Sequence, residues 1–209
     1  MPNSEPPSEE RQPESYSELA RVQQIVLDVL KVDRNHRIPG EERRENVVEH
    51  SFSVAMQSWR IHEALGLDLS LEKILKYAQV HDFPERGLSQ DINTFADPEQ
   101  RRFKEAHEQE ELNKIIAEFP NFEDFTKTLV DYRAQADEEA LFVWSVDKMQ
   151  AIILGEIDDW RPYIILGISY DAFCAKNEEL LAQCSPHVSE LFAEVIERGK
   201  QTYYDRPSE

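Results

Sequence analysis

The sequence predicts an all-α fold, and three observations support this. One pattern recurs along the chain: a capping residue, then apolar positions at helical spacing, then a glycine, proline or polar break. Alternating β-branched runs bounded by hairpin turns are absent from the sequence, and the one candidate strand, residues 163–168, is equally compatible with a helix. The length of 209 residues fits one domain, and 40% hydrophobic with 31% charged residues is typical of a globular protein.

We therefore expect one helical domain of about eight helices over residues 15–205. Residues 1–14 combine prolines and glutamates with almost no apolar side chains, so burial would not offset the entropy lost on ordering them. They are expected to form a disordered acidic tail. The first helix begins at Ser15, which has a capping-box partner in Glu18, and it has one apolar face. Later helices are expected over residues 46–64, 70–83, 97–119, 121–132, 137–154, 170–181 and 185–203.

Local start and stop signals set these bounds. Gly66 ends the second helix, and Ser70 caps the third. Pro84 ends the third helix because its ring interrupts the helical hydrogen bonds. Asp97 followed by Pro98 begins the fourth helix. The remaining helices begin at Asn121, Asp137, Tyr170 and Ser185.

The charge and the glycine content exclude several classes of function. Lys+Arg 23 against Asp+Glu 42 gives a net charge of −19, and so acidic a surface repels nucleic-acid backbones and anionic lipid headgroups. A nucleic-acid polymer is therefore not expected as a partner. With only 6 glycines, the chain has neither a Gly-x-Gly-x-x-Gly motif nor a Walker loop, which disfavours Rossmann and P-loop nucleotide enzymes.

The cysteines and the hydropathy indicate a cytoplasmic protein. Cys174 and Cys184 can build neither a disulfide framework nor a structural zinc site, and they are expected to be reduced thiols in the core. The first residues lack the apolar segment of a signal peptide, and no run approaches the roughly 18 apolar residues of a membrane span. No contact with a membrane is expected.

Polar side chains interrupt the apolar stripes of three predicted helices. His50 lies among the apolar positions of the second, His81 and Asp82 continue the stripe of the third, and Asp147 lies within that of the sixth. Taken alone, each is more often a hydrogen-bonded core residue, a cap or an ion-pair member. Together, two histidines and two aspartates facing one interior need a common partner, because an unpaired buried carboxylate costs several kcal/mol. A divalent cation is the natural partner.

Four segments carry a family resemblance: ENVVEHSFSVAM, VHDFPE, SQDINT and FVWSVDKMQAI. Over about residues 37–154 the chain resembles the HD superfamily of metal-dependent phosphohydrolases, and within it the 5′-deoxynucleotidase-like group. The resemblance implies a helical fold in which the metal ligands are His50, His81, Asp82 and Asp147.

Two imidazole nitrogens and two carboxylate oxygens suit one divalent transition metal: Mn²⁺, Fe²⁺, Co²⁺, Ni²⁺ or Zn²⁺. A second metal would need further histidines. His62 lies about 18 Å along the helix from His50 and points elsewhere, and His107 lies in a charged segment where it is expected to be solvated or outside the ligand set. We therefore expect one metal.

The resemblance also implies roles for residues around the metal. Glu85 orients the attacking water or passes a proton to the leaving oxygen; read without the motif, it would be a solvent-exposed loop carboxylate. Asp91 and Thr94 contact sugar and phosphate, although Asn93 replaces the family's proline. Arg37 orients the phosphate, and Ile38 stands where the family has a tryptophan that crowds the ribose 2′-hydroxyl, so deoxyribose selection should be weak. Lys148 is expected to lie outside the site as a solvated residue.

The predicted function is metal-dependent removal of phosphate from nucleoside 5′-monophosphates, small-molecule substrates that a hydroxide generated at the metal would attack. The alternative within the same scaffold is a hydrolase of nucleoside triphosphates or signalling nucleotides, which would need more cationic side chains around the pocket. A third hypothesis is a non-catalytic helical interaction module that keeps the metal for stability. An intact Glu85 argues against it, because a purely structural metal would not need that side chain.

The oligomeric state stays open at this point. Members of the family that this chain resembles are often dimers. The apolar positions near the C-terminus could form the face of a homodimer or simply complete the core; they are Val188, Leu191, Phe192 and Val195.

Overall fold

The computed structural model describes residues 16–204, and within them the all-α prediction is confirmed. The predicted tail over residues 1–14 and the proposed cap Ser15 lie outside this range. The helices are α1 (Tyr16–Val29), α2 (Val47–Leu65), α3 (Leu71–Val80), α4 (Pro98–Glu118), α5 (Glu123–Arg133), α6 (Glu138–Ile157), α7 (Arg161–Ile165), α8 (Tyr170–Leu181) and α9 (Ser189–Tyr204). Short 3₁₀ turns lie at η1 (Phe83–Glu85) and η2 (Pro186–Val188). Residues 163–168, the candidate strand, overlap α7 instead.

Side-chain caps begin several helices where the sequence predicts them. Asn46 accepts hydrogen bonds from the amides of Val48 and Glu49, and the Glu49 carboxylate accepts in return from the Asn46 amide. Asp97 and Gln100 form the same reciprocal capping box at α4. Each box satisfies backbone donors that have no partner inside the helix. These contacts span three residues, which is why they are readable from the sequence.

The third helix ends earlier than predicted. Its last residue is Val80, His81 caps it, and the chain then turns at Asp82 into the 3₁₀ turn η1, which contains Pro84. A residue before proline avoids the α conformation, so the disturbance from Pro84 starts upstream of the proline itself. Asp82 lies at φ −101 and ψ 9, in the bridge region between helix and strand. The predicted helix included Asp82, but in the structure this residue lies beyond the end of α3.

A two-stranded antiparallel hairpin was not predicted. It pairs β1 (Asp33–Arg37) with β2 (Arg44–Asn46), in a register that places Asp33 opposite Asn46. The sequence of β1, DRNHR, lacks the apolar alternation that signals a strand. Its polar side chains instead find partners in the candidate site described below.

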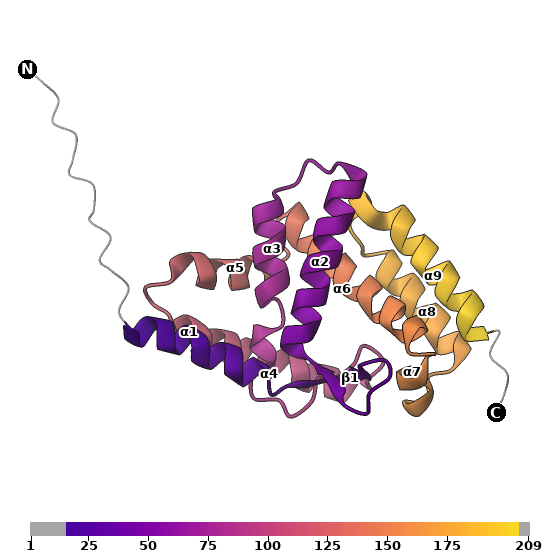
Figure 1. Cartoon of the computed structure of the whole chain (residues 1–209), viewed down its shortest axis with the longest axis horizontal. Helices are drawn as coiled ribbons and strands as arrows, with labels where there is room; N and C mark the ends of the chain where they lie inside the picture. The colour runs from indigo at the N-terminus through magenta and orange to yellow at the C-terminus, as the bar shows by residue number, and fades with distance from the viewer. Residues whose placement is uncertain (1–15, 205–209) are drawn as a thin grey trace, which may run out of the picture.

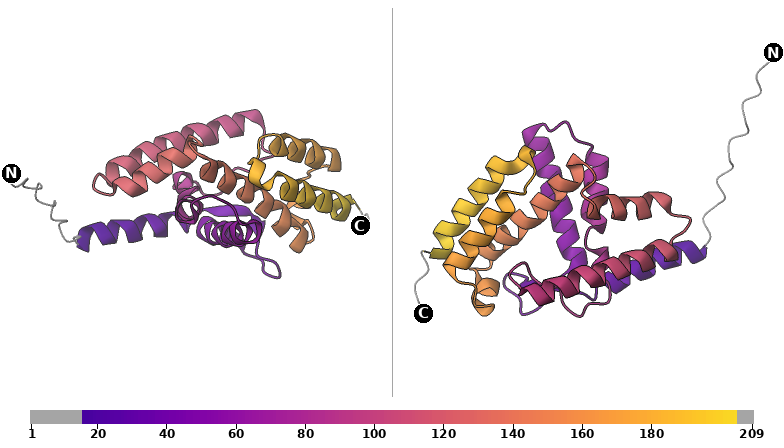
Figure 2. Two further views of the ribbon diagram at one scale, coloured as in Figure 1. Left: turned by 90° about the horizontal axis from the view of Figure 1, so that it is seen from above. Right: turned by 180° about the vertical axis from the view of Figure 1, so that it is seen from behind.

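Helix α6 is the centre of the molecule. It contacts α2 and α3 on one side and α9 on the other, as Figures 1 and 2 show. The main core surrounds it and includes Phe142, Met149, Trp160, Phe173 and Phe192, all almost fully buried. The apolar C-terminal positions join this core: Val188 and Phe192 are buried, and Leu191 and Val195 pack against it. All four positions therefore contribute to the core of this chain.

A second, smaller core links the N-terminal helix to α4 and α5. Ile25 from α1 packs with Leu112 and Ile115 from α4 and with Leu129 from α5. In both views of Figure 2, α1 lies at the end of the molecule opposite α8 and α9. None of the described helices combines the length and hydropathy needed to cross a membrane.

The cap of α6 supplies a stability prediction. The Asp137 carboxylate accepts hydrogen bonds from the Ala140 amide at 2.9 Å and the Tyr77 hydroxyl at 2.8 Å, and it lies 2.7 Å from Lys73 Nζ. Although burial opposes it, the bond from Lys73 lowers the pKa of Asp137 below its usual value. We expect Asp137→Ala to reduce the free energy of unfolding by about 1–3 kcal/mol near neutral pH.

The pH dependence of that effect has a definite sign. Because the pKa of Asp137 is lower in the folded state, its contribution is complete above the unfolded pKa of about 3.9 and is lost as the pH falls through the folded pKa. Urea denaturation of both proteins from neutral to strongly acidic pH measures this. The Asp137→Asn control keeps an oxygen for the cap without the charge and should lie between the two. A penalty for Asp137→Ala that is constant over this range would contradict the assignment.

Candidate metal centre

Three elements bring the four predicted ligands together. His50 comes from α2, His81 and Asp82 from the end of α3, and Asp147 from α6. His50 Nε2 lies 3.0 Å from Asp147 Oδ1 and 3.2 Å from His81 Nε2. Asp82 Oδ2 is 3.5 Å from His50 Nε2 and 3.3 Å from His81 Nε2. Residues from positions 50 to 147 therefore meet at one point.

A hydrogen bond on His81 and a carboxylate behind His50 set the orientation of the two rings. His81 Nδ1 lies 2.9 Å from the Ala78 carbonyl, which only accepts, so Nδ1 carries the hydrogen and Nε2 has a free lone pair. His50 Nδ1 faces the Glu45 carboxylate at 3.8 Å on its outer side. Burial and the Arg34 guanidinium lower the pKa of His50 to about 4, so its ring is neutral at physiological pH. Two neutral nitrogens and a carboxylate thus face one another.

This donor set fits a divalent cation. The ligand atoms of His50, His81 and Asp147 all lie within 4.8 Å of one another, and the three residues are buried. Metal–ligand bonds of about 2.0–2.2 Å place neighbouring ligands about 3 Å apart, which matches the spacings seen here. Among residues 16–204, this is the cluster of His, Cys, Asp and Glu side chains with the spacing of a metal site. Asp82 lies beside it rather than within the 4.8 Å set.

Arg34, which the sequence analysis missed, holds Asp82. Its Nη1 donates to Asp82 Oδ2 at 2.8 Å, and its side chain also lies 3.6 Å from Glu45 and 3.8 Å from Asp91. Although burial opposes it, the neighbouring His81 and the Arg34 guanidinium lower the pKa of Asp82 to about 2. Asp82 is therefore an anion in the buried site.

The prediction that Arg37 faces the phosphate is not supported by its position. Its guanidinium donates to the backbone carbonyl and the carboxylate of Glu42, in the turn beyond β1. Neither Arg37 nor Ile38 is among the described residues that line the pocket. Arg34, three residues earlier in the chain, lies beside the ligands instead. The expected effect of Ile38 on deoxyribose selection therefore loses its structural basis.

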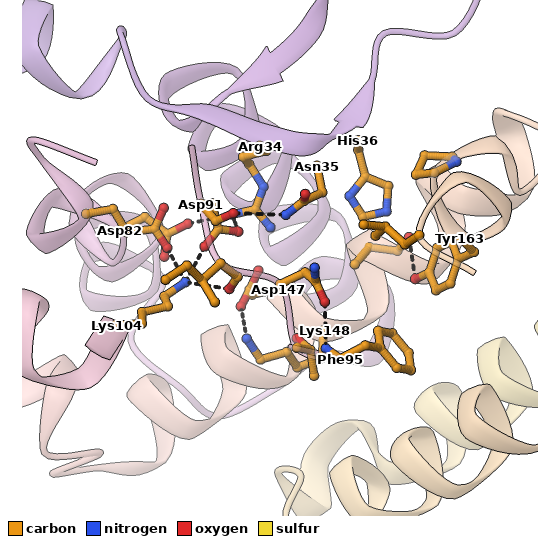
Figure 3. Close-up of a pocket in the computed structure, with 17 residues that line it drawn as sticks. Arg34, Asn35, His36, Asp82, Asp91, Phe95, Lys104, Asp147, Lys148 and Tyr163 are labelled. Carbon is orange, nitrogen blue, oxygen red and sulfur yellow. Dashed lines mark hydrogen bonds and ion pairs between the residues drawn. The ribbon is translucent and has the colours of Figure 1, made fainter. Parts of the chain in front are cut away.

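A pocket opens beside the ligands (Figure 3), and its lining carries opposing charges. The cations are Arg34, Lys104 and Lys148, and the carboxylates are Asp82, Glu85, Asp91 and Asp147. With the histidines neutral and Glu85 protonated, the three remaining carboxylates balance the three cations. A bound divalent cation would make the pocket net positive and attractive to a phosphate group.

Glu85 is buried beside the pocket, not exposed in a loop. It is 1% exposed, its Oε1 accepts from Lys104 Nζ at 2.5 Å, and its Oε2 has no hydrogen-bond partner. Burial and the neighbouring Asp82 and Asp91 carboxylates raise the pKa of Glu85 well above its usual value. The side chain is thus suited to hold a proton near the ligands.

Lys104 reaches the pocket from α4 and bridges two carboxylates. Its Nζ donates to both Glu85 and Asp91. Although burial opposes it, these two carboxylates raise the pKa of Lys104 well above its usual value, so the ammonium stays charged. The sequence around it, RRFKEAHEQEE, is charged throughout and offers no signal that sets this lysine apart.

The loop after η1 brings the predicted sugar-binding residues into the lining. The Asp91 amide donates to the Asp33 carbonyl at 2.8 Å, which ties the loop to β1. Asn93 Oδ1 accepts from the Phe95 amide at 2.8 Å, so an Asn side chain shapes the turn in which the family's proline would stand. Asp91 and Thr94 both line the pocket, as their assignment requires.

Lys148 lies at the pocket, and the prediction that it is solvated outside the site is wrong. Its Nζ donates to Asp147 Oδ2 at 2.6 Å and lies 5.8 Å from the centre of the Trp144 ring. Although burial opposes it, the Lys148 charge is the main influence that lowers the pKa of Asp147 well below its usual value. One residue along a helix turns by about 100°, so Lys148 can reach back over its neighbour's carboxylate.

The other two candidate histidines are engaged elsewhere. His62 Nε2 lies 2.9 Å from the Leu69 carbonyl, and His107 Nε2 lies 2.9 Å from the Arg86 carbonyl. Both cysteines are free thiols of intermediate burial. Neither histidine contacts the ligand cluster, so a single metal remains the prediction.

Comparisons with known proteins agree with this geometry. The family model described as "HD domain" matches residues 28–188. A crystal structure of a predicted metal-dependent phosphohydrolase from Magnetospirillum magnetotacticum MS-1 superposes with a TM-score of 0.69 and 19% sequence identity, covering 91% of this chain and 100% of that one. At this identity the likeness is one of fold. No curated protein matches the sequence.

Proposed function

This chain belongs to the HD-domain family, and from that premise we propose that it is a metal-dependent phosphohydrolase that removes phosphate from nucleoside 5′-monophosphates. One observation supports this most directly: His50, His81 and Asp147 converge beside a buried Glu85, in a pocket that three cationic side chains line. A metal site, a proton carrier and phosphate-binding cations are the parts that phosphoester hydrolysis requires.

The proposed ligands of one divalent transition metal are His50, His81, Asp82 and Asp147. Mn²⁺, Fe²⁺, Co²⁺, Ni²⁺ and Zn²⁺ are the ions that two imidazoles and two carboxylates suit. When bound, such an ion polarises a phosphoryl oxygen and lowers the pKa of water. Arg34 keeps Asp82 ionised and oriented by its 2.8 Å hydrogen bond, and Glu45 lies behind His50.

Lysine side chains of the pocket are placed to bind the phosphate. Lys148 has three donor hydrogens and uses one on Asp147, which leaves two for phosphoryl oxygens. Lys104 neutralises Asp91 and Glu85, the carboxylates that would otherwise repel the substrate. Arg34 adds a guanidinium that stays charged beside the ligands.

Glu85 is proposed as the acid–base residue. Its raised pKa lets it hold a proton near neutral pH, and its Oε2 has no protein partner that would compete for that proton. As the P–O bond to the nucleoside 5′-oxygen breaks and a water oxygen bonds to phosphorus, Glu85 gives its proton to the leaving 5′-oxygen and takes up the proton that the attacking water loses. The products are a nucleoside and inorganic phosphate.

The preference for monophosphates is supported by a neighbouring cation that is already paired with a carboxylate. Arg133 lines a neighbouring pocket with Asp82 and Lys148, but its Nη1 donates to Glu108 at 2.5 Å. Triphosphates and signalling nucleotides need additional unpaired cations for their extra phosphates. They form the alternative substrate class on the same site.

A substrate screen tests this function. Purified protein loaded with Mn²⁺ or Co²⁺ is expected to release phosphate from nucleoside 5′-monophosphates faster than from di- or triphosphates. A chelator should reduce the release to background, and added metal should restore it, because the proposed hydrolysis depends on the bound metal. Release confined to triphosphates would favour the alternative. No metal-dependent release from any nucleotide would favour a non-catalytic module.

A further inference from the structure

His36 lies in the same pocket and has no part in the chemistry described so far. It follows Arg34 by two residues on β1, and both side chains line the pocket. Its ring meets the Tyr163 ring edge to face, with centroids 5.8 Å apart. Figure 3 shows His36 and Tyr163 at one end of the pocket and Asp82 with Lys104 at the other.

One ring nitrogen of His36 is an unused acceptor. The ring is hydrogen-bonded to the backbone of Ala151, whereas its Nε2 is buried and has no partner. Burial and the nearby Arg34 charge lower the pKa of His36 to about 3, so the ring is neutral. A neutral ring that donates through Nδ1 has only a lone pair at Nε2. A buried acceptor without a donor reduces stability, which makes it a feature that needs an explanation.

Its neighbours in the pocket are already engaged. Asn35 donates to the Asp91 carbonyl at 3.0 Å and accepts from Gln90 at 2.7 Å. The Tyr163 hydroxyl donates to the Ala151 carbonyl at 3.3 Å. Arg34 is held by Asp82. Among these lining residues, Arg34 Nε and His36 Nε2 have no hydrogen-bond partner, and His36 Nε2 is the acceptor of the two.

The chemistry of that position restricts what it can bind. A neutral acceptor gains nothing from phosphate oxygens, which are acceptors too, but it binds a hydroxyl or an N–H group. Ala151 lies one helical turn after Asp147 on α6, about 6 Å along the axis. A group that reaches His36 from a phosphate at the metal site must span about that length, as the sugar of a nucleotide does. The base would extend beyond it, past Phe95 and Tyr163.

We propose that His36 is a specificity-determining residue whose Nε2 accepts a hydrogen bond from a ribose hydroxyl of the substrate. The inference rests on the proposed function, because it takes the phosphate position from it. The 2′- and 3′-hydroxyls offer the same chemistry, and deleting each in turn distinguishes them.

The experiment crosses substrate deletions with protein variants. Ribose, 2′-deoxyribose and 3′-deoxyribose 5′-monophosphates of one base are compared with wild type, His36→Phe and His36→Gln. In wild type, loss of the bound hydroxyl is expected to lower kcat/KM by about tenfold or more, mainly through KM, since the bond is remote from the reacting atoms. In His36→Phe, the ratio of kcat/KM for the ribose substrate to that for the deoxy substrate should fall to about one. His36→Gln places an amide near Nε2 and should restore part of it.

Controls separate this role from a structural one. His62→Phe makes the same change at a histidine bonded to the Leu69 carbonyl, away from the pocket, and should leave all ratios as in wild type. Metal content and Tm confirm that His36→Phe folds. A readout with little turnover is the rise in Tm that each monophosphate causes in metal-loaded Glu85→Gln protein, which should follow the same ranking as kcat/KM in wild type.

The outcomes discriminate. A selective loss of hydroxyl discrimination in His36→Phe supports the inference. An equal loss of kcat/KM for all three substrates in His36→Phe, or equal kcat/KM for them in wild type together with equal Tm shifts in the Glu85→Gln protein, overturns it while the proposed function stands. If no nucleoside monophosphate is hydrolysed by metal-loaded wild type, the proposed function itself fails, and the inference fails with it.

Discussion

Replacing Asp147 by Ala is expected to remove both the bound metal and the activity. Asp147 supplies a carboxylate from α6, 3.0 Å from His50 Nε2, while the other proposed ligands come from α2 and the end of α3. Changes to residues that only support a ligand typically cost about 10–100-fold in metal affinity or activity, and loss of a ligand should cost more. Activity should therefore fall below detection, and metal should be lost on dialysis.

Elemental analysis of the dialysed protein decides this prediction. Glu156→Ala is a matched control on the same helix, since Glu156 pairs with Arg198 on the surface and should keep its metal. Asp147→Asn preserves the shape of the side chain and guards against a folding defect in the Ala variant. Undiminished metal content in both Asp147 variants would disprove the assignment of this ligand.

Replacing Glu85 should separate catalysis from metal binding. Glu85→Ala and Glu85→Gln are expected to retain metal but to lower kcat by about 10²-fold or more, the usual scale for losing a positioned acid–base group. The physical reason is that Glu85 is buried, with a raised pKa and an unpartnered Oε2, next to the proposed ligands rather than among them.

The control for the Glu85 variants is a buried carboxylate with no proposed catalytic role. Glu111 is 7% exposed and pairs with Arg86 at 3.0 Å, and Glu111→Gln should change kcat little. Metal content and kcat are measured on the same preparations. Loss of metal together with activity in the Glu85 variants would make Glu85 a ligand, contrary to the proposed role.

The electrostatics of the pocket explain why these carboxylates can coexist. Asp82 and Asp147 have lowered pKa values because Arg34 and Lys148 are among the charges next to them, whereas Glu85 has a raised pKa because burial and two anionic neighbours outweigh Lys104. Neighbouring carboxylates with opposite shifts are the arrangement in which one binds as an anion and another carries a proton. The arrangement depends on cations from β1, α4 and α6.

The helices were predictable because their signals are local. Asn46 and Asp97 each find capping partners within three residues, so the sequence carries the complete interaction. The ligand candidates were predictable for a related reason: a His or Asp that interrupts an apolar stripe must face the interior of the helix packing. His50, His81 and Asp147 do converge there.

The surroundings of those ligands were decided by the tertiary structure alone. Arg34 and Lys104 lie in segments that are polar or charged throughout, where nothing local distinguishes a buried ion-pair residue from a solvated one. The strands of the hairpin show no apolar alternation, so the sequence did not predict them. The resemblance to the family placed Arg37 beside the site, but in the structure Arg37 pairs with Glu42. Periodicity reports which way a side chain points on its own helix, but ion pairing depends on which distant residues the fold brings near. The candidate ligands thus came from the sequence, and their electrostatic environment came from the packing of β1 against α6 and of α4 against η1.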